Sequence, residues 1–154
     1  MARTAFATLL LALSCTASAV DAPKLVDPWI RATPPQVPTG AAYVTIQGGD
    51  AADKLTGAKT NVAAKVEIHT TKQQDGVMHM MPMDSLAIPA HSAVKLAPGG
   101  EHLMLIGLKR GLTPGETVTI TLQFEHAGAV DVAFPVLDAR ASEPEHPGDH
   151  MNNH

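Results

Sequence analysis

Few residues of this sequence are aromatic, charged or cysteine, and each scarcity narrows the class of protein. Aromatic residues make up only 3% of the 154 residues, so a core has to be built from aliphatic side chains and methionine. Charged residues make up 17%, which is compatible with a globular protein. The net charge is -4 without a basic stretch, which argues against nucleic acid as a partner. No nucleophile–base pair or carboxylate dyad is recognisable in the sequence. We therefore expect a protein that is not an enzyme.

The first residues are typical of an export signal. Arg3 supplies a positive charge, residues 6–13 form an apolar run too short to span a bilayer, and residues 17–19 read Ala-Ser-Ala. We predict that residues 1–19 are a secretory signal peptide, cleaved after Ala19, and that the protein is periplasmic. An alternative stays open, because Ala12-Leu13-Ser14-Cys15 is a weak lipobox that could lead to lipidation at Cys15.

Cleavage after Ala19 would remove Cys15, the one cysteine of the chain. The mature protein would then have neither a disulfide nor a thiolate. In an oxidising compartment this is relevant to metal binding, because methionine and histidine ligands cannot be lost to disulfide formation. Methionine can still be oxidised to the sulfoxide, so the protection is partial.

Short segments of alternating apolar and polar residues follow the signal. Residues 42–47, 65–71 and 117–124 each alternate as a half-buried strand does. In the last of them we expect Val118, Ile120, Leu122 and Phe124 to face the core. No convincing helical period appears. Seven to nine short strands at this spacing predict an all-β fold, a Greek-key β-sandwich or barrel, over residues 20–138.

Proline and glycine mark the connections between these segments. The prolines within residues 20–40 predict a loop there, with at most a short edge strand at residues 29–31. Asp75-Gly76 is a strong turn signal and predicts a β-hairpin between residues 65–71 and 77–81. We expect Pro82 to end the second strand of this hairpin.

The last residues, 139–154, differ in composition from the rest. They contain prolines and acidic residues and one sizeable apolar side chain, so they cannot bury enough surface to fold and are predicted to be a flexible tail. This tail carries four side chains that could bind a metal: His146, His150, Met151 and His154.

A candidate metal site begins at His102-Leu103-Met104. Because side chains alternate along a strand, His102 and Met104 should share one face and Leu103 the other. An imidazole beside a thioether suits a soft ion such as Cu(I). Alone, however, a His-x-Met pair is more often a half-buried strand with an ordinary packing methionine.

The predicted hairpin brings two further candidates. His69 and Met80 lie eleven residues apart across its turn. They are directly opposed if the turn is centred between Gln74 and Asp75, and diagonal neighbours on the same face if it is centred at Asp75-Gly76. Zinc would more often recruit cysteine or carboxylate, and calcium and magnesium prefer oxygen, so these donors favour Cu(I).

The remaining methionines and histidines have weaker claims. Met78 shares a predicted face with Met80 and could be an auxiliary ligand, whereas His79 is expected on the opposite face. The methionines of this segment could equally be adaptable packing side chains. His91 and His126 lie in predicted loops and are expected to be solvated.

The spacing of the four candidates resembles the motif His-x10-Met-x21-His-x-Met of the periplasmic copper chaperones called PCu(A)C, matched here by His69, Met80, His102 and Met104. The resemblance covers about residues 27–137. It implies a cupredoxin-like β-sandwich that binds one Cu(I) near solvent. It also implies delivery of copper to the Cu(A) centre of cytochrome c oxidase, either to its subunit II or through a thiol-disulfide copper chaperone. We expect the protein to be a monomer. In some members of the PCu(A)C family, a His/Met-rich C-terminal tail also takes part in binding Cu(II).

Two other classes of copper-binding protein have to be considered. An electron-transfer cupredoxin needs a cysteine ligand, which the mature chain would lack. A periplasmic copper buffer or resistance protein would bind Cu(I) without delivering it to an oxidase. The sequence does not separate this alternative from a chaperone.

Overall fold

The computed structural model describes residues 21–138 and residue 140. Within this part of the chain every regular element is a β-strand. The described residues therefore contain no helix that could cross a membrane. The signal peptide, Cys15 and the four candidate ligands of the tail lie outside the described residues. The strands are β1 (Lys24–Arg31), β2 (Thr39–Gln47), β3 (Asp53–Lys59), β4 (Ala63–Gln74), β5 (Val77–Met83), β6 (Leu86–Ile88), β7 (Ala93–Leu96), β8 (His102–Leu108), β9 (Thr117–Phe124) and β10 (Gly128–Leu137).

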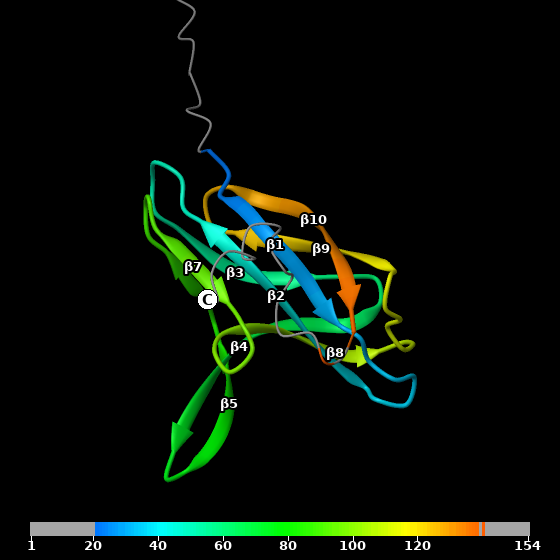
Figure 1. Ribbon diagram of the computed structural model, residues 1–154. Coiled ribbons are helices and arrows are strands. Elements are labelled where there is room, and N and C mark those ends of the chain that lie inside the picture. The colour runs from blue at the N-terminus through cyan, green and yellow to red at the C-terminus, as the bar shows by residue number, and fades with distance from the viewer. Residues whose placement is uncertain (1–20, 139, 141–154) are drawn as a thin grey trace, which may run out of the picture.

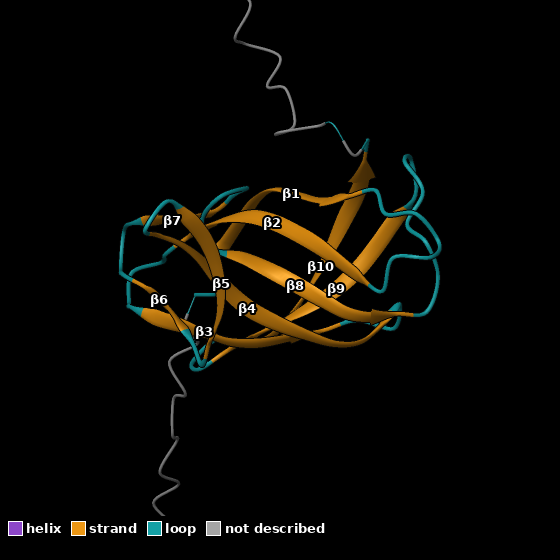
Figure 2. Ribbon diagram, turned by 90° about the horizontal axis from the view of Figure 1, so that it is seen from below, coloured by secondary structure: helices purple, strands orange, loops and turns teal. Residues whose placement is uncertain are grey.

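Most of these strands form one closed barrel. They pair in the order β4, β8, β2, β1, β10, β9 and β3, and β3 pairs back to β4 to close the ring. The pairing of β1 with β10 is parallel, whereas the other strands pair antiparallel. The barrel is seen from below in Figure 2, with β6 and β7 at one end. The predicted all-β class with a sandwich or barrel architecture is confirmed.

The core is aliphatic, as the composition requires. The inward row predicted for β9 is buried throughout, with Val118, Ile120, Leu122 and Phe124 each at most 2% exposed. On β10 the buried row is Val132, Phe134 and Val136. Antiparallel pairing places the two rows on the same face, because Ile120 lies opposite Val132 and Val118 lies opposite Phe134.

Two expectations about prolines were wrong. Residues 24–31 form a full strand, β1, that pairs on both sides rather than a loop with an edge strand. Pro28 is accommodated because the register to β2 shifts between Val26 and Trp29, and Asp27 adopts a φ of 51° there. Pro82 does not end β5, which continues to Met83; β5 is an edge strand, where a missing N–H is tolerated.

The hairpin of β4 and β5 extends beyond the barrel as a projecting arm (Figure 1). We define the arm as residues 70–81. Its tip is a two-residue turn at Asp75 (φ 53°) and Gly76 (φ 78°), the left-handed pair that a tight hairpin requires. Val77, Met78, Met80 and Met81 on the arm are between 42% and 59% exposed. The arm therefore presents large apolar side chains to solvent.

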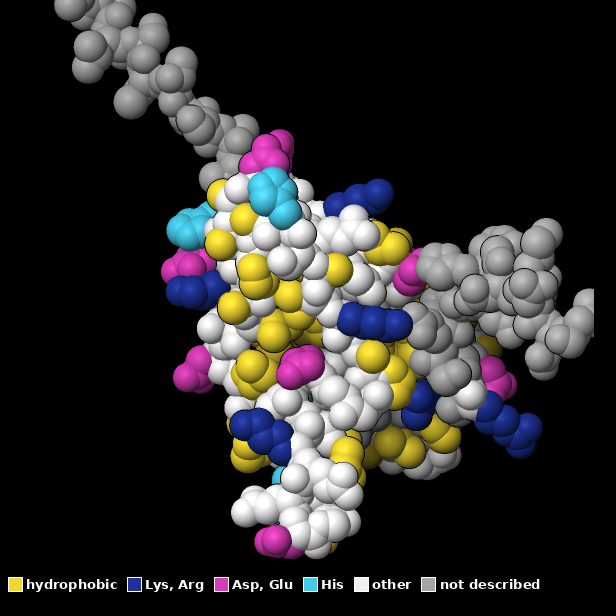
Figure 3. Space-filling model, turned by 60° about the vertical axis from the view of Figure 1, so that its left-hand side comes forward, with side chains coloured by type: hydrophobic (Ala, Val, Ile, Leu, Met, Phe, Trp, Pro, Cys, Tyr) yellow, Lys and Arg dark blue, Asp and Glu magenta, His cyan; other side chains and the backbone are white. Residues whose placement is uncertain are grey.

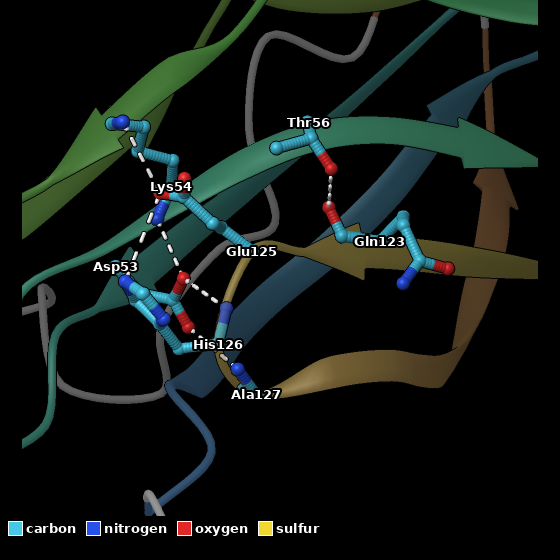
Figure 4. Close-up of polar contacts among 7 residues, drawn as sticks. All are labelled: Asp53, Lys54, Thr56, Gln123, Glu125, His126 and Ala127. Carbon is cyan, nitrogen blue, oxygen red and sulfur yellow. Dashed lines mark hydrogen bonds and ion pairs between the residues drawn. The ribbon is translucent and has the colours of Figure 1, made fainter.

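Asp53 links β3 to the turn between β9 and β10. This carboxylate is 7% exposed and accepts three backbone N–H groups, from Lys54 at 2.7 Å and from His126 and Ala127 at 2.9 Å (Figure 4). Burial raises the pKa of Asp53, but the hydrogen bonds from His126, Ala127 and Lys54 outweigh it, so the net pKa lies below its ordinary value.

Candidate metal centre

The centre of the candidate site is a pair of imidazoles on neighbouring strands. His69 on β4 lies directly opposite His102 on β8, and the ring centroids are 5.8 Å apart. Leu103 and Leu105 point the other way and are fully buried in the core. The predicted division of β8 into a core face and a histidine face is therefore confirmed.

His102 is held by a backbone carbonyl. It is 3% exposed, and its Nδ1 lies 3.1 Å from the oxygen of Gly100. Because a carbonyl oxygen only accepts, Nδ1 carries the proton and Nε2 keeps its lone pair. Nε2 is buried and has no hydrogen-bond partner among the described residues. Burial lowers the pKa of His102, the Gly100 carbonyl opposes this, and His69 adds to the lowering while Glu101 opposes it.

His69 is held by a carboxylate instead. Its side chain is 13% exposed, and Nε2 donates to Oε2 of Glu67 at 2.9 Å. Nδ1 is then the nitrogen with the lone pair in the neutral ring, and it too is buried without a hydrogen-bond partner in the described part of the chain. Lys65 donates to the other Glu67 oxygen at 2.6 Å, and hydrogen bonds from Lys65 and then from His69 lower the pKa of Glu67.

The two thioethers flank the imidazole pair. Met104 lies opposite Glu67 on one side, and Met80 lies opposite Thr71 on the other. The turn is centred at Asp75-Gly76, so Met80 is a diagonal neighbour of His69, the second of the two predicted registers. Each flanking position is about 7 Å along β4 from the level of the imidazoles, from a rise of about 3.3 Å per residue.

The thioethers differ in exposure. Met80 is 59% exposed on the arm, whereas Met104 is partly buried on the barrel wall. Met78 lies opposite Gln73, one further pair toward the tip, and is 54% exposed. The location near solvent that the PCu(A)C resemblance implies therefore holds for Met80. It does not hold for His102, which is almost fully buried. Methionine has a long flexible side chain, which suits it to reach an ion from such a flanking position.

The other described histidines lie away from this face. His79 lies opposite Lys72, on the opposite face of the hairpin from Met80, as predicted. His91 and His126 are exposed and lie 3.9 Å from Asp50 and 3.7 Å from Glu125. Figure 3 shows histidine side chains at the end of the molecule opposite the arm. The exposure of His91 and His126 agrees with the expectation that both side chains are solvated.

This donor set suits a soft monovalent ion. Two imidazole rings lie 5.8 Å apart between centroids, and the strand register places Met80 and Met104 on the same face. Among the described residues, no group of three or more His, Cys, Asp or Glu side chains could hold a metal ion. The arrangement therefore lacks the ligand set that zinc usually recruits, whereas imidazole and thioether donors favour Cu(I).

Sequence reasoning missed two features of this site. The first is Glu67, which was not among the predicted site residues, although its position two residues before His69 on a strand was the available signal. The second feature is an aromatic pair behind His102: Tyr43 lies 6.4 Å from the His102 ring and 4.5 Å from Trp29, between ring centroids. Burial raises the pKa of Tyr43, and Arg31 partly opposes the rise. No local pattern signalled that these strands meet.

Comparison with known proteins identifies the family. A family model described as "Putative lipoprotein LpqE-like" matches residues 24–136. The chain belongs to the LpqE-like family. It is 36% identical over 95 residues to "Putative lipoprotein Lxx21020" of Leifsonia xyli subsp. xyli (strain CTCB07). That match covers 61% of this LpqE-like chain and 57% of the relative, so it spans little more than half the length of the relative.

Solved structures similar to this LpqE-like protein include PCuAC domains. The copper-bound PCuAC domain from PmoF2 has a TM-score of 0.66 and 28% identity, covering 78% of this chain and 96% of that one. The solution structure of apo-DR1885 from Deinococcus radiodurans has a TM-score of 0.59 and 35% identity, covering 90% and 93%. The CuI-DR1885 form has a TM-score of 0.59 and 34% identity, covering 82% and 85%. The PCu(A)C resemblance is thus confirmed at the level of fold.

Proposed function

We propose that this protein is a Cu(I)-binding metallochaperone, with His69, His102, Met80 and Met104 as the ligands of one copper ion. The observation that carries the proposal is a pair of buried imidazole nitrogens, Nδ1 of His69 and Nε2 of His102, that have no hydrogen-bond partner in residues 21–138 and 140. A buried polar atom left unpaired costs about 1–3 kcal/mol, and metal ligation would satisfy both. Met78 on the arm is an auxiliary ligand in this proposal.

The exposure of the arm supports a carrier rather than a permanent copper site. Met80 reaches the ion from solvent, whereas His69 and His102 hold it from the barrel wall. All four donors are uncharged, so a thiolate-bearing acceptor could remove the ion. In this proposal copper is cargo that enters and leaves at the arm.

The acceptor in this proposal is the Cu(A) centre of cytochrome c oxidase, reached through its subunit II or a thiol-disulfide copper chaperone. Support comes from the similar PCuAC domains, one of them described as copper-bound, and from the relative described as CuI-DR1885. Residues 20–138 would form the copper-binding domain of a monomer. His146, His150, Met151 and His154 of the tail would contribute a Cu(II) site.

The proposed location is the cell envelope. The relatives are described as lipoproteins, which supports export, with residues 1–19 as the signal. Periplasmic release after Ala19 and lipidation at Cys15 are the two forms this export could take. Mass spectrometry of the exported protein distinguishes them, because lipidation adds acyl mass to a chain that begins at Cys15.

A Cu(I) competition titration tests the proposed site. Wild-type protein is compared with a His102→Ala/Met104→Ala variant and with a His91→Ala/His126→Ala control, which removes two exposed histidines elsewhere. We expect the first variant to lose about 100-fold or more in affinity, which corresponds to about 2.7 kcal/mol, and the control to retain wild-type affinity. Equal affinities in all three proteins would refute the assignment.

Delivery needs a separate experiment in cells. Deletion of the gene should reduce Cu(A) assembly in cytochrome c oxidase under limiting copper, and the wild-type gene but not the His102→Ala/Met104→Ala gene should restore it. Normal Cu(A) content in the deletion strain, together with increased copper sensitivity, would favour a copper buffer or resistance protein instead.

A further inference from the structure

Both carboxylate oxygens of Glu67 accept hydrogen bonds on the strand face that carries His69. Its Oε2 accepts the hydrogen bond from Nε2 of His69 at 2.9 Å, and its Oε1 accepts from Nζ of Lys65 at 2.6 Å. The three residues alternate along β4, so their side chains share one face of the sheet. Lys65 and His69 thus fix the position of the carboxylate from its two sides.

This contact selects one tautomer of His69. A neutral imidazole carries its proton on either nitrogen, and only the other nitrogen can bind a metal. Because a carboxylate only accepts hydrogen bonds, Nε2 of His69 keeps the proton and Nδ1 keeps the lone pair. The hydrogen bond also restricts rotation of the ring, so the lone pair has a defined direction.

His69 and His102 are each held in one tautomer by a hydrogen-bond acceptor, but the two acceptors differ in kind. The proton of His102 is held by the backbone oxygen of Gly100, which no side-chain substitution removes. The proton of His69 is held by a side chain, that of Glu67. Substitution of Glu67 can therefore alter the orientation of the His69 ring without replacing one of the proposed ligands.

Glu67 also places a carboxylate next to one of the proposed ligands, His69. Its Cα is the cross-strand partner of Met104, and its Oε2 lies 2.9 Å from Nε2 of His69. The four proposed ligands are uncharged, so a carboxylate near them favours binding of a cation, although Lys65 offsets part of its charge. The Lys65–Glu67 pair itself contributes little to stability, because the two side chains are 59% and 32% exposed.

We infer that Glu67 is a positioning residue for Cu(I), which holds His69 in the Nε2-protonated tautomer and directs Nδ1 to the ion. This role rests on the proposed function. Partners of this kind, which hydrogen-bond to a ligating histidine, typically change metal affinity about 10- to 100-fold when they are removed. The carboxylate acts through His69 and is not itself a ligand.

The test compares wild type with Glu67→Ala, Glu67→Gln and a matched control, Glu101→Ala. Glu101 neighbours His102 and contacts the Thr70 hydroxyl at 3.3 Å, so its removal takes away an equal charge without a hydrogen bond to either imidazole. The first measurement is the tautomer of His69 in the metal-free protein, read from long-range ¹H–¹⁵N correlation spectra of the ring nitrogens. The second is Cu(I) affinity by competition, with His69→Ala as the reference for loss of the ligand.

We expect Glu67→Ala to mix the tautomers of His69 and to weaken Cu(I) binding about tenfold or more. Glu67→Gln, whose amide oxygen still accepts from Nε2, should lose less, and Glu101→Ala should lose least and leave the His69 tautomer unchanged. An unchanged tautomer in Glu67→Ala would overturn the inference. So would unchanged affinity in that variant while His69→Ala loses binding.

Failure of the proposed function gives a different result. Wild-type protein would then bind no Cu(I), and the role of Glu67 toward the metal would fall with it. The tautomer measurement on metal-free protein would still show whether Glu67 controls the His69 ring. The two failures are therefore distinguishable.

Discussion

Removal of the Asp53 carboxylate should destabilise the barrel by about 3 kcal/mol. The carboxylate is 7% exposed and accepts three backbone N–H groups that join β3 to the turn between β9 and β10 (Figure 4). Each such hydrogen bond contributes about 1 kcal/mol net, and its loss leaves the donor of His126 or Ala127 without an acceptor. Against a typical total of about 5–15 kcal/mol this is a large fraction.

Urea unfolding measures the effect. Asp53→Ala should lower the midpoint at an unchanged m-value, since the variant exposes the same surface on unfolding. Glu125→Gln is the matched control, because it leaves the Asp53 hydrogen bonds in place and removes two exposed charge contacts of Glu125. These are the ion pair with Lys54 at 3.1 Å, between side chains that are 52% and 42% exposed, and the 3.7 Å contact with His126. Such a pair contributes about 0.5 kcal/mol or less. A loss below about 1 kcal/mol in Asp53→Ala would refute the reasoning.

The pH dependence gives a second check on the same residue. The folded-state pKa of Asp53 lies below its ordinary value of 3.8, so the ionised carboxylate stabilises the fold above that pH. This contribution is lost as the pH falls through the folded-state pKa. The stability difference between wild type and Asp53→Asn should therefore be full at pH 7 and shrink below about pH 4. A difference that stays constant down to pH 2 would contradict the account.

Two further predictions concern the candidate site and its support. Cu(I) affinity of wild-type protein should fall as the pH falls below about 6, because a protonated imidazole cannot bind. Burial lowers the pKa of His102, so His102 itself should remain able to bind to a lower pH than a free histidine, whose pKa is about 6.5. Flat affinity from pH 7.5 to 5 would exclude imidazole ligation. Leu105→Ala should cost about 2–5 kcal/mol in urea unfolding, because the fully buried side chain leaves a cavity behind β8.

Local patterns predicted the strands because one face of each is buried. In β9 the alternation of Val118 to Phe124 follows directly from a core on one side and solvent on the other. The same rule separated His102 and Met104 from Leu103. Closure of the barrel could not be predicted in this way, because the pairing of β3 with β4 and of β1 with β10 depends on contacts far apart in the sequence.

Local patterns failed where tertiary pairing outweighs a residue's own preference. Pro28 reads as loop, but a register shift next to it lets β1 pair with both neighbours. Pro82 reads as a strand end, but the open edge of β5 does not require every N–H. For the site, spacing alone left two hairpin registers open. The positive φ angles of Asp75 and Gly76 correspond to the diagonal one.

The cost of the imidazole pair is the strongest physical argument for a ligand at this site. Two buried nitrogens, Nδ1 of His69 and Nε2 of His102, have no hydrogen-bond partner within the described part of the chain, and each such atom costs about 1–3 kcal/mol of stability. An aliphatic side chain at either position would avoid that cost on a wall whose other face is already apolar. Gly100 and Glu67 satisfy one nitrogen of each ring and leave the other free. In the proposed site, a single cation would supply the missing partner to both nitrogens, and this would offset the cost of burying them.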